Sequence, residues 1–158
     1  MKILFICTHN RCRSILSEAI VNHCSGGKLT ARSAGSQPAG VVHPLSLKYL
    51  AEAQIETSNL KSQSWGDFEE FEPNLVITVC DSAAKEACPV WFDKTLKLHW
   101  GLRDPSKLDG SENEIADAFR QTIAEITNRT HALLKLPLAE LDQNQLQGEI
   151  EKLGASIS

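Results

Sequence analysis

Short runs of apolar and β-branched residues alternate along the chain with longer segments in which apolar side chains recur at helical spacing. Buried parallel strands are typically short, continuous apolar runs of this kind. The two clearest runs are 2–6 and 75–79, and two weaker ones are 29–32 and 95–98. The helical pattern covers 15–24, 43–53 and 111–136. This alternation predicts an α/β fold, a parallel sheet covered by helices on both faces.

The segment 111–136 carries the longest helical pattern. Ser111 followed by Glu114 is a capping box, and apolar residues at helical spacing come after it, at Ile115, Phe119, Ile123, Ile126 and Leu133. After Pro137, apolar residues at similar spacing predict a further amphipathic helix that ends near Gly154. We therefore predict one domain over residues 1–136 and a C-terminal helical extension over 137–158, packed on or beside it.

Length and charge narrow the class of protein. A chain of 158 residues is the size of one globular domain, which buries about 68–70% of its unfolded surface. The net charge is −4 and the basic residues are scattered, so no patch favours nucleic acid or an anionic membrane. The first apolar run is too short for a signal peptide, and no segment approaches the length of a membrane span. We expect a cytoplasmic protein with no nucleic-acid and no membrane partner.

The five cysteines fit a reducing compartment. In such a compartment they are more often catalytic, metal-binding or buried than joined in stable disulfides, and their odd number agrees with this. They are Cys7, Cys12, Cys24, Cys80 and Cys88.

The stretch ICTHNRCRSIL, residues 6–16, leads from the first predicted strand into the first predicted helix. Loop N–H groups and a helix N-terminus that converge on one spot bind anions. We expect Cys7 to be a thiolate at neutral pH, because the helix dipole, Arg13 and a hydrogen bond from Ser14 favour the ionised form. The fork of Arg13 matches two oxygens of a tetrahedral oxyanion. The predicted oxyanion-binding residues are Thr8, His9, Asn10, Arg11, Cys12 and Arg13.

A bare Cys-x5-Arg pattern arises often by chance, as a buried cysteine at a strand end and a surface arginine. Here the strand before it and the serine and helix after it favour an anion loop. Asn10 also tolerates the left-handed backbone conformation that a tight anion cradle requires.

These residues resemble a known family. CTHNRCRS is similar to the Cys-x5-Arg-Ser phosphate loop of low molecular weight protein tyrosine phosphatases and of the arsenate reductases built on the same fold. The resemblance continues in SAG at 33–35, HP at 43–44 and DP at 104–105, so it spans about residues 1–135. It implies a three-layer sandwich with a four-stranded parallel sheet, and Asp104 as a general acid above Cys7.

The role of Asp104 also has support from chemistry. An Asp before Pro on a loop after a strand is held extended and exposed, which suits a group that gives a proton to a leaving oxygen. The alternative is a simple Asp-Pro turn.

The stretch TVCDSAAKEACPVW indicates a branch of the family, because a plain phosphatase has no use for Cys80 and Cys88. The order of Cys7, Cys80 and Cys88 resembles that of the thioredoxin-coupled arsenate reductases, as does HWGLRDP at 99–105. The resemblance implies that Cys7 attacks arsenic, Cys80 attacks the Cys7 sulfur and expels arsenite, and Cys88 then forms a redox-active disulfide with Cys80. In those enzymes the second pair lies one residue closer than it does here.

We therefore predict an arsenate reductase that acts in arsenical resistance and detoxification. The predicted catalytic residues are Cys7, Arg13, Ser14, Cys80, Cys88 and Asp104. Its substrate is arsenate, with phosphate or sulfate as competing anions, and thioredoxin or a glutaredoxin and glutathione system is the external reductant. No bound cofactor and no metal ligand are predicted. Asn10, Glu18 and Ser33 match the potassium site of the resembled enzymes, but Gln63 stands where they have Asp, so no bound potassium is predicted.

Two other functions stay open. A low molecular weight tyrosine phosphatase would use Cys7, Arg13 and Asp104 in the same way, with water completing the cycle. Such enzymes usually have aromatic residues just after the Asp-Pro pair, whereas here Ser106 and Lys107 follow; residual phosphatase activity remains compatible with the site. A non-enzymatic protein that binds arsenite or zinc through its thiols is the second alternative, although zinc sites usually show closer pairs and four clear ligands.

Overall fold

The computed structural model describes residues 1–80 and 95–137, together with 140, 142, 144–149 and 152. The elements of the described residues follow in the order β1 (Lys2–Ile6), α1 (Arg13–Cys24), β2 (Thr30–Ala34), α2 (Pro44–Glu52), the 3-10 helix η1 (Trp65–Phe71), β3 (Leu75–Thr78), β4 (Leu96–His99), the short 3-10 helix η3 (Pro105–Lys107) and α4 (Glu112–Leu134).

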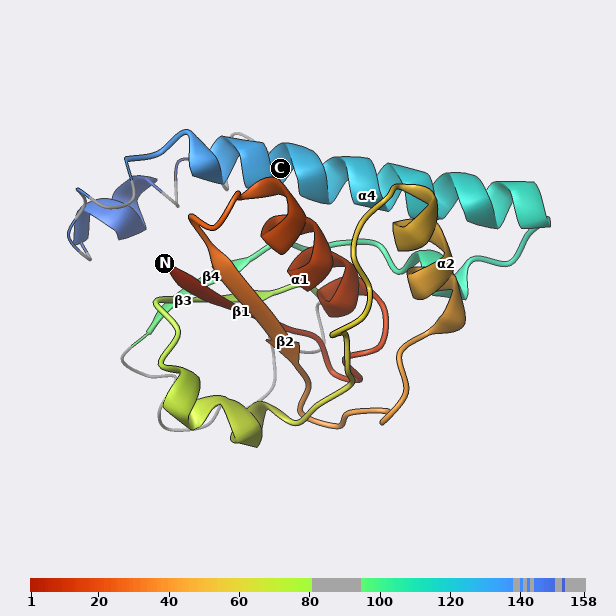
Figure 1. The fold of residues 1–158 in the computed structure, drawn as a ribbon, viewed down its shortest axis with the longest axis horizontal. Helices are drawn as coiled ribbons and strands as arrows, with labels where there is room; N and C mark the ends of the chain where they lie inside the picture. Colours follow the sequence, from red (N-terminus) through yellow and green to blue (C-terminus); the bar gives the residue numbers. More distant parts are fainter. Residues whose placement is uncertain (81–94, 138–139, 141, 143, 150–151, 153–158) are drawn as a thin grey trace.

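The four strands form one parallel sheet in the order β2-β1-β3-β4. Figure 1 shows α1, α2 and α4 on one side of the sheet and η1 on the other side. The predicted α/β fold, a three-layer sandwich with a four-stranded parallel sheet, is confirmed.

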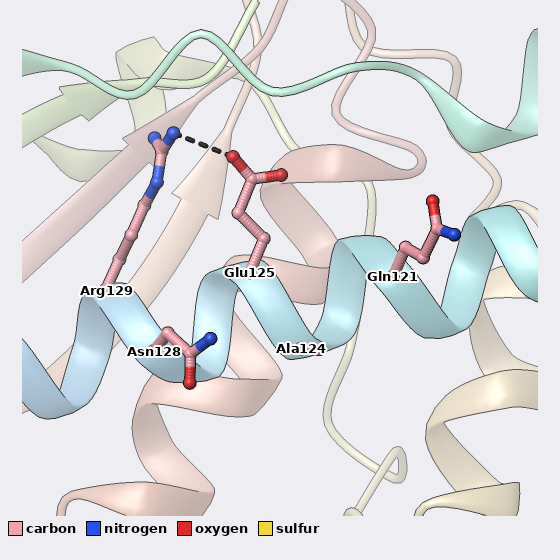
Figure 2. Close-up of a pocket in the computed structure, with 5 residues that line it drawn as sticks. All are labelled: Gln121, Ala124, Glu125, Asn128 and Arg129. Atoms are coloured by element: carbon pink, nitrogen blue, oxygen red, sulfur yellow. Dashed lines mark hydrogen bonds and ion pairs between the residues drawn. The ribbon is translucent and has the colours of Figure 1, made fainter. Parts of the chain in front are cut away.

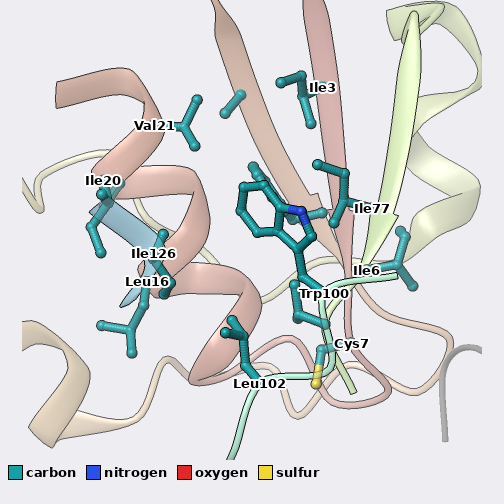
Figure 3. Packing of buried hydrophobic residues seen from close by; sticks show 14 of the residues in the cluster. Ile3, Ile6, Cys7, Leu16, Ile20, Val21, Ile77, Trp100, Leu102 and Ile126 are labelled. Atoms are coloured by element: carbon teal, nitrogen blue, oxygen red, sulfur yellow. The ribbon is translucent and has the colours of Figure 1, made fainter. Parts of the chain in front are cut away.

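The central position of β1 explains its apolar sequence. Since it is paired on both edges and covered on both faces, residues 3–6 are all buried, whereas a half-exposed strand would alternate. Figure 3 shows Ile3 and Ile77 of the sheet in the same apolar layer as Leu16 and Ile20 of α1, with Trp100 between them. This core holds the carboxyl ends of β1 and β3 in place beneath the loops that follow them.

The structure shifts several predicted boundaries, and the reasons are local. The second strand is Thr30–Ala34 rather than 29–32, because its polar Ser33 is buried in the sheet and hides the apolar pattern. Helix α1 begins at Arg13, two polar residues before the first apolar one. Helix α4 begins after Ser111 as predicted, since the Ser111 hydroxyl accepts a hydrogen bond from the Glu114 N–H at 3.2 Å. The 3-10 helix η1 was not predicted, because it has no helical periodicity.

Beyond α4, residues 144–149 are helical and Leu146 is buried in the same core as the sheet. The division of the chain after residue 136 remains a prediction. None of the helices in the described residues is long and apolar enough to cross a membrane.

Candidate active site

The site lies where the chain order of the strands reverses. From β1 the chain moves to β2 on one side and later to β3 on the other, and in open parallel sheets ligands bind at the carboxyl ends of such strands. Cys7 follows β1 directly and Cys80 comes two residues after β3, so the fold brings the two together. Both are buried, and the Cys80 sulfur lies 3.8 Å from the Thr8 hydroxyl. Cys88, the third predicted cysteine, lies outside the described residues.

A second loop, residues 35–43, covers the outer side of residues 7–12, which follow β1 and are called the anion loop below after their predicted role. The carbonyl oxygens of Thr8, His9 and Arg11 accept hydrogen bonds at 2.9 Å from the N–H groups of Gln37, Ala39 and His43, respectively. Over the part of the chain that is described, the backbone N–H groups of residues 9–13 donate to no backbone carbonyl. The carbonyl groups of the loop accept hydrogen bonds from the second loop, whereas the N–H groups have no backbone acceptor in these parts of the chain. Free N–H groups that line one side of a loop favour the binding of an anion there.

Asn10 and Gly35 explain how the loop keeps its shape. Asn10 has a φ of 45°, which confirms the predicted left-handed conformation, and it is completely buried. Its side chain donates to the Ser14 hydroxyl and accepts from the Gln63 N–H, both at 2.8 Å. At Gly35 a Cβ atom would lie 2.5 Å from the Thr8 carbonyl oxygen, so only glycine allows this approach.

Arg13, the first residue of α1, has two of its three nitrogens engaged. Nη1 donates to the Leu102 carbonyl at 3.1 Å, and Nη2 lies 3.5 Å from Oδ2 of Asp104. Its buried Nε has no hydrogen-bond partner among the described residues. The structure thus brings together Arg13 and Asp104, two of the predicted catalytic residues, and the role of Asp104 as an acid stays a prediction. The Nε proton remains for an anion.

The surroundings of Cys7 in this arrangement oppose the expected ionisation, which stays a prediction. A hydrogen bond with the Cys80 thiol and burial raise the pKa of Cys7, and the opposing effect of the Arg13 charge is smaller. The sequence could not show that the Cys80 sulfur touches Cys7. A Cys7 thiolate therefore forms only when the Cys7 proton passes to solvent or to another base. The predicted donation from Ser14 to Cys7 stays a prediction; the Ser14 hydroxyl oxygen accepts a hydrogen bond from the Asn10 side chain, and this contact does not use the Ser14 proton.

The other loop residues differ in their surroundings. Burial raises the pKa of Cys12 to about 11, although hydrogen bonds with Ser46 and Ser106 oppose the rise, so Cys12 is a thiol at neutral pH. His9 is exposed, and its Nδ1 lies 3.1 Å from the Gln37 carbonyl oxygen. The side chain of Arg11 is also exposed. Oxyanion binding by residues 8–12 stays a prediction.

Sequence reasoning missed Ser106, which lies beside the predicted acid. Asp104 caps η3, and its Oδ1 accepts a hydrogen bond from the Ser106 N–H at 3.0 Å. An Asp side chain that bonds the backbone two residues later is a common turn, so the order Asp-Pro-Ser was the available signal.

The residues that matched a potassium site each have other partners here. Oε1 of the buried Glu18 accepts a hydrogen bond from Ser33 at 2.7 Å, and burial raises the pKa of Glu18. The Asn10 oxygen accepts from Gln63, as described above. Within the described ranges, no group of three or more His, Cys, Asp and Glu side chains is placed to hold a metal ion.

One open surface depression lies apart from this site. Figure 2 shows its lining, which comes only from α4: Gln121, Ala124, Glu125, Asn128 and Arg129. Arg129 pairs there with Glu125 at 2.8 Å. The depression includes no residue of the anion loop.

Comparison with known proteins identifies the family. The family model of the low molecular weight phosphotyrosine protein phosphatase matches residues 2–147. The chain therefore belongs to this family. It is 33% identical over 127 residues to an arsenate reductase of Halalkalibacterium halodurans, covering 80% of this chain and 90% of that protein. It is 36% identical over 110 residues to an arsenate reductase of Staphylococcus xylosus, covering 70% of this chain and 82% of the relative.

Comparison with solved structures also finds arsenate reductases as similar proteins. A thioredoxin-dependent arsenate reductase of Corynebacterium glutamicum superposes with a TM-score of 0.65 at 30% identity, over 85% of this chain and 60% of that longer one. An arsenate reductase in a phosphate-binding state superposes with a TM-score of 0.70 at 25% identity, over 85% of this chain and 96% of the other.

Proposed function

We propose that this chain is an arsenate reductase and that Cys7 attacks arsenic. The Cys7 thiolate forms an S–As bond while the As–O bond of an As–OH group breaks with its electron pair on oxygen. Asp104 gives this oxygen a proton, and it leaves as water. Arsenic is still As(V) after this step, and Arg13 with the loop amides balances the charge of its remaining oxygens.

The reduction itself is assigned to Cys80. Its thiolate attacks the Cys7 sulfur, an S–S bond forms, and the S–As bond breaks with its electron pair on arsenic. As(V) thereby becomes As(III), two thiols become one disulfide, and arsenite leaves after it takes up protons from solvent. The contact between the Cys7 and Cys80 thiols supports this step, since it puts the second sulfur beside the first.

Cys88 completes the cycle in this proposal by attacking Cys80, which frees Cys7 and moves the disulfide outward. A dithiol protein then reduces the Cys80–Cys88 bond and is itself oxidised. The Corynebacterium glutamicum neighbour, which is thioredoxin-dependent, supports thioredoxin as this reductant. Such a cycle needs a reducing compartment, and we propose that the enzyme works in the cytoplasm.

Variants of the three cysteines test the mechanism. Cys88→Ser should release about one arsenite per chain and stop with a Cys7–Cys80 disulfide, whereas Cys80→Ser should stop before any disulfide forms. Cys24→Ser, at the end of α1, is the matched control and should turn over normally. Arsenite release is followed over time, and peptide mapping assigns the disulfides. Multiple turnovers by both Cys80→Ser and Cys88→Ser would refute the shuttle.

The reductant and the phosphatase alternative are tested together. Arsenate-dependent NADPH oxidation is measured with the thioredoxin system and with the glutaredoxin and glutathione system in separate reactions. Hydrolysis of an aryl phosphate needs only Cys7, Arg13 and Asp104, so it should survive in the Cys80 and Cys88 variants. Efficient aryl phosphate hydrolysis without arsenate reduction by either system would favour the phosphatase.

A further inference from the structure

We propose that Ser106 is a positioning residue that fixes which oxygen of Asp104 carries the catalytic proton. The inference rests on the proposed function, because it assumes that Asp104 is the general acid. Ser106 is half-buried, two residues after Asp104, in η3.

The two oxygens of the Asp104 carboxyl group have different partners. Oδ1 accepts two hydrogen bonds from Ser106, one from its hydroxyl at 2.5 Å and one from its N–H at 3.0 Å. Oδ2 lies 3.5 Å from Nη2 of Arg13, at the start of α1 and beside the anion loop. The same serine therefore holds the carboxyl group from the side away from Arg13.

This difference decides where an acid proton resides. A protonated carboxyl group has one O–H donor, and its other oxygen is an acceptor. Because Oδ1 already accepts from two donors, a proton on Oδ1 would have to displace the Ser106 hydroxyl. The proton therefore belongs on Oδ2, the oxygen that faces Arg13 and any oxyanion bound by it. Ser106 also prevents a rotation of the carboxyl group that would exchange the two oxygens.

A further contact ties Ser106 to the anion loop. Ser106 and Ser46 of α2 both lie close enough to Cys12 to lower its pKa, although burial keeps Cys12 a thiol at neutral pH. Ser106 therefore lies near both Asp104 and Cys12 of the anion loop. A small displacement of an acid from its place beside the substrate is enough to slow proton transfer.

The substitution Ser106→Ala removes the hydroxyl and keeps the backbone N–H, so the turn at Asp104 persists. We measure kcat/KM for phenyl phosphate, whose leaving group needs a proton, and for 2,4-dinitrophenyl phosphate, whose leaving group does not. We expect a loss of about tenfold for the first ester and less than about twofold for the second, against the ~10²–10⁴-fold loss that removal of a placed acid causes. Single-turnover arsenite release, where water is the leaving group, should slow by about the same tenfold.

Three variants make the test specific. Ser106→Thr keeps the hydroxyl and should restore the rate with phenyl phosphate and with arsenate. Ser58→Ala is the matched control, because Ser58 makes a similar bond to a carboxylate two residues away, to Glu56 at 2.6 Å, on an exposed surface. It should change neither rate. The inhibition constant for inorganic phosphate should stay the same in Ser106→Ala, since the anion loop is intact.

The outcomes separate this inference from the proposed function. Equal losses with both esters, or no rescue by threonine, would mean that Ser106 is merely structural and overturn the inference. A full rate in Ser106→Ala with a slow Asp104→Asn would overturn the inference and leave Asp104 as the acid. A full rate in Asp104→Asn would overturn both.

Discussion

Two arginine–carboxylate pairs differ in geometry and in surroundings. Arg120 of α4 and Glu52 of α2 form two hydrogen bonds, at 2.7 and 3.2 Å, and about half of each side chain is exposed. Arg13 and Asp104 meet in a single contact of 3.5 Å, and their side chains are only 16% and 15% exposed. The pair with the better geometry thus lies on the surface, and the poorer one lies in the candidate site.

The reason for the difference is that Arg13 and Asp104 have other partners. The Leu102 carbonyl takes one nitrogen of Arg13, and Ser106 takes one oxygen of Asp104. What remains is the buried Nε of Arg13, which has no hydrogen-bond partner among the described residues, and Oδ2 of Asp104, whose contact with Arg13 is long. A bidentate pair uses up its donors and acceptors, whereas an incomplete one keeps some of them for a substrate.

Removal of the acid should give the largest effect. Asp104→Asn should slow arsenite release in a single turnover by roughly 10²–10⁴, because water must then leave arsenic without a proton from Asp104. Inhibition by phosphate should persist, since Arg13 and the loop amides remain. Glu52→Gln, the same kind of change in the other pair, should leave the rate unaltered. A normal rate in Asp104→Asn would make Asp104 a turn residue.

The second-largest loss of activity is expected when the arginine of the site is replaced by lysine. Arg13→Lys keeps the charge but loses the planar fork, so we expect a loss of roughly 10²–10³ in kcat/KM for arsenate, the usual effect of removing one oxyanion donor. Arg120→Lys is the matched control and should keep full activity. Steady-state kinetics with phosphate as a competitor measure both variants. Equal activities of the two would contradict the role of Arg13.

Much of this arrangement could be predicted from local sequence. The apolar run of β1 predicts a central strand, and the residues after it predict an anion loop, because chain neighbours determine both. The capping of α4 by Ser111 followed from a spacing of three residues. Asn10 adopts the expected left-handed conformation.

Contacts between distant segments could not be predicted in the same way. The thiols of Cys7 and Cys80 meet because β1 and β3 are neighbours in the sheet, and this contact reverses the expected direction of the Cys7 pKa. The clash that excludes a side chain at Gly35 also depends on a close approach of two loops. Residues 35–43 cover the carbonyl groups of the anion loop, and no periodic pattern in the sequence predicts this contact.

The pKa of Cys7 gives a third test that distinguishes the Arg13–Asp104 pair, which lies in the candidate site, from the Arg120–Glu52 pair on the surface. Cys80→Ala removes the largest cause that raises this pKa, so alkylation of Cys7 should reach half its maximal rate at a lower pH than in the wild type. Arg13→Gln removes the opposing charge and should move the midpoint to higher pH. Arg120→Gln should leave it in place. Iodoacetamide labelling at several pH values, read by mass spectrometry of the Cys7 peptide, measures all three. An unchanged midpoint in Cys80→Ala would mean that the two sulfurs do not interact in solution.

The smallest effect is expected at the surface pair. Hydrogen bonds from Arg120 lower the pKa of Glu52, the more so because the Arg120 and Lys48 charges act in the same direction. A carboxyl group with a lowered pKa in the folded state stabilises the fold above its unfolded value, about 4.3 for Glu, and loses this contribution as the pH falls through the folded value. Arg120→Ala should therefore lower Tm slightly at pH 7, since exposed pairs contribute little.

The pH dependence is the informative part of this last measurement. The difference in Tm between the wild type and Arg120→Ala should shrink as the pH falls from about 4.3 through the lowered pKa of Glu52, because the carboxyl group then becomes protonated in both proteins. It should also shrink in high salt, because an exposed pair is screened. Glu52→Gln should reproduce the shift, and activity should stay normal in both variants. A Tm difference that persists at low pH would instead indicate lost packing of Arg120 on the Tyr49 ring, whose centroid lies 5.9 Å from the guanidinium. A fall in activity in both variants would contradict the contrast between the two pairs, because it would show that the Arg120–Glu52 pair also affects the site.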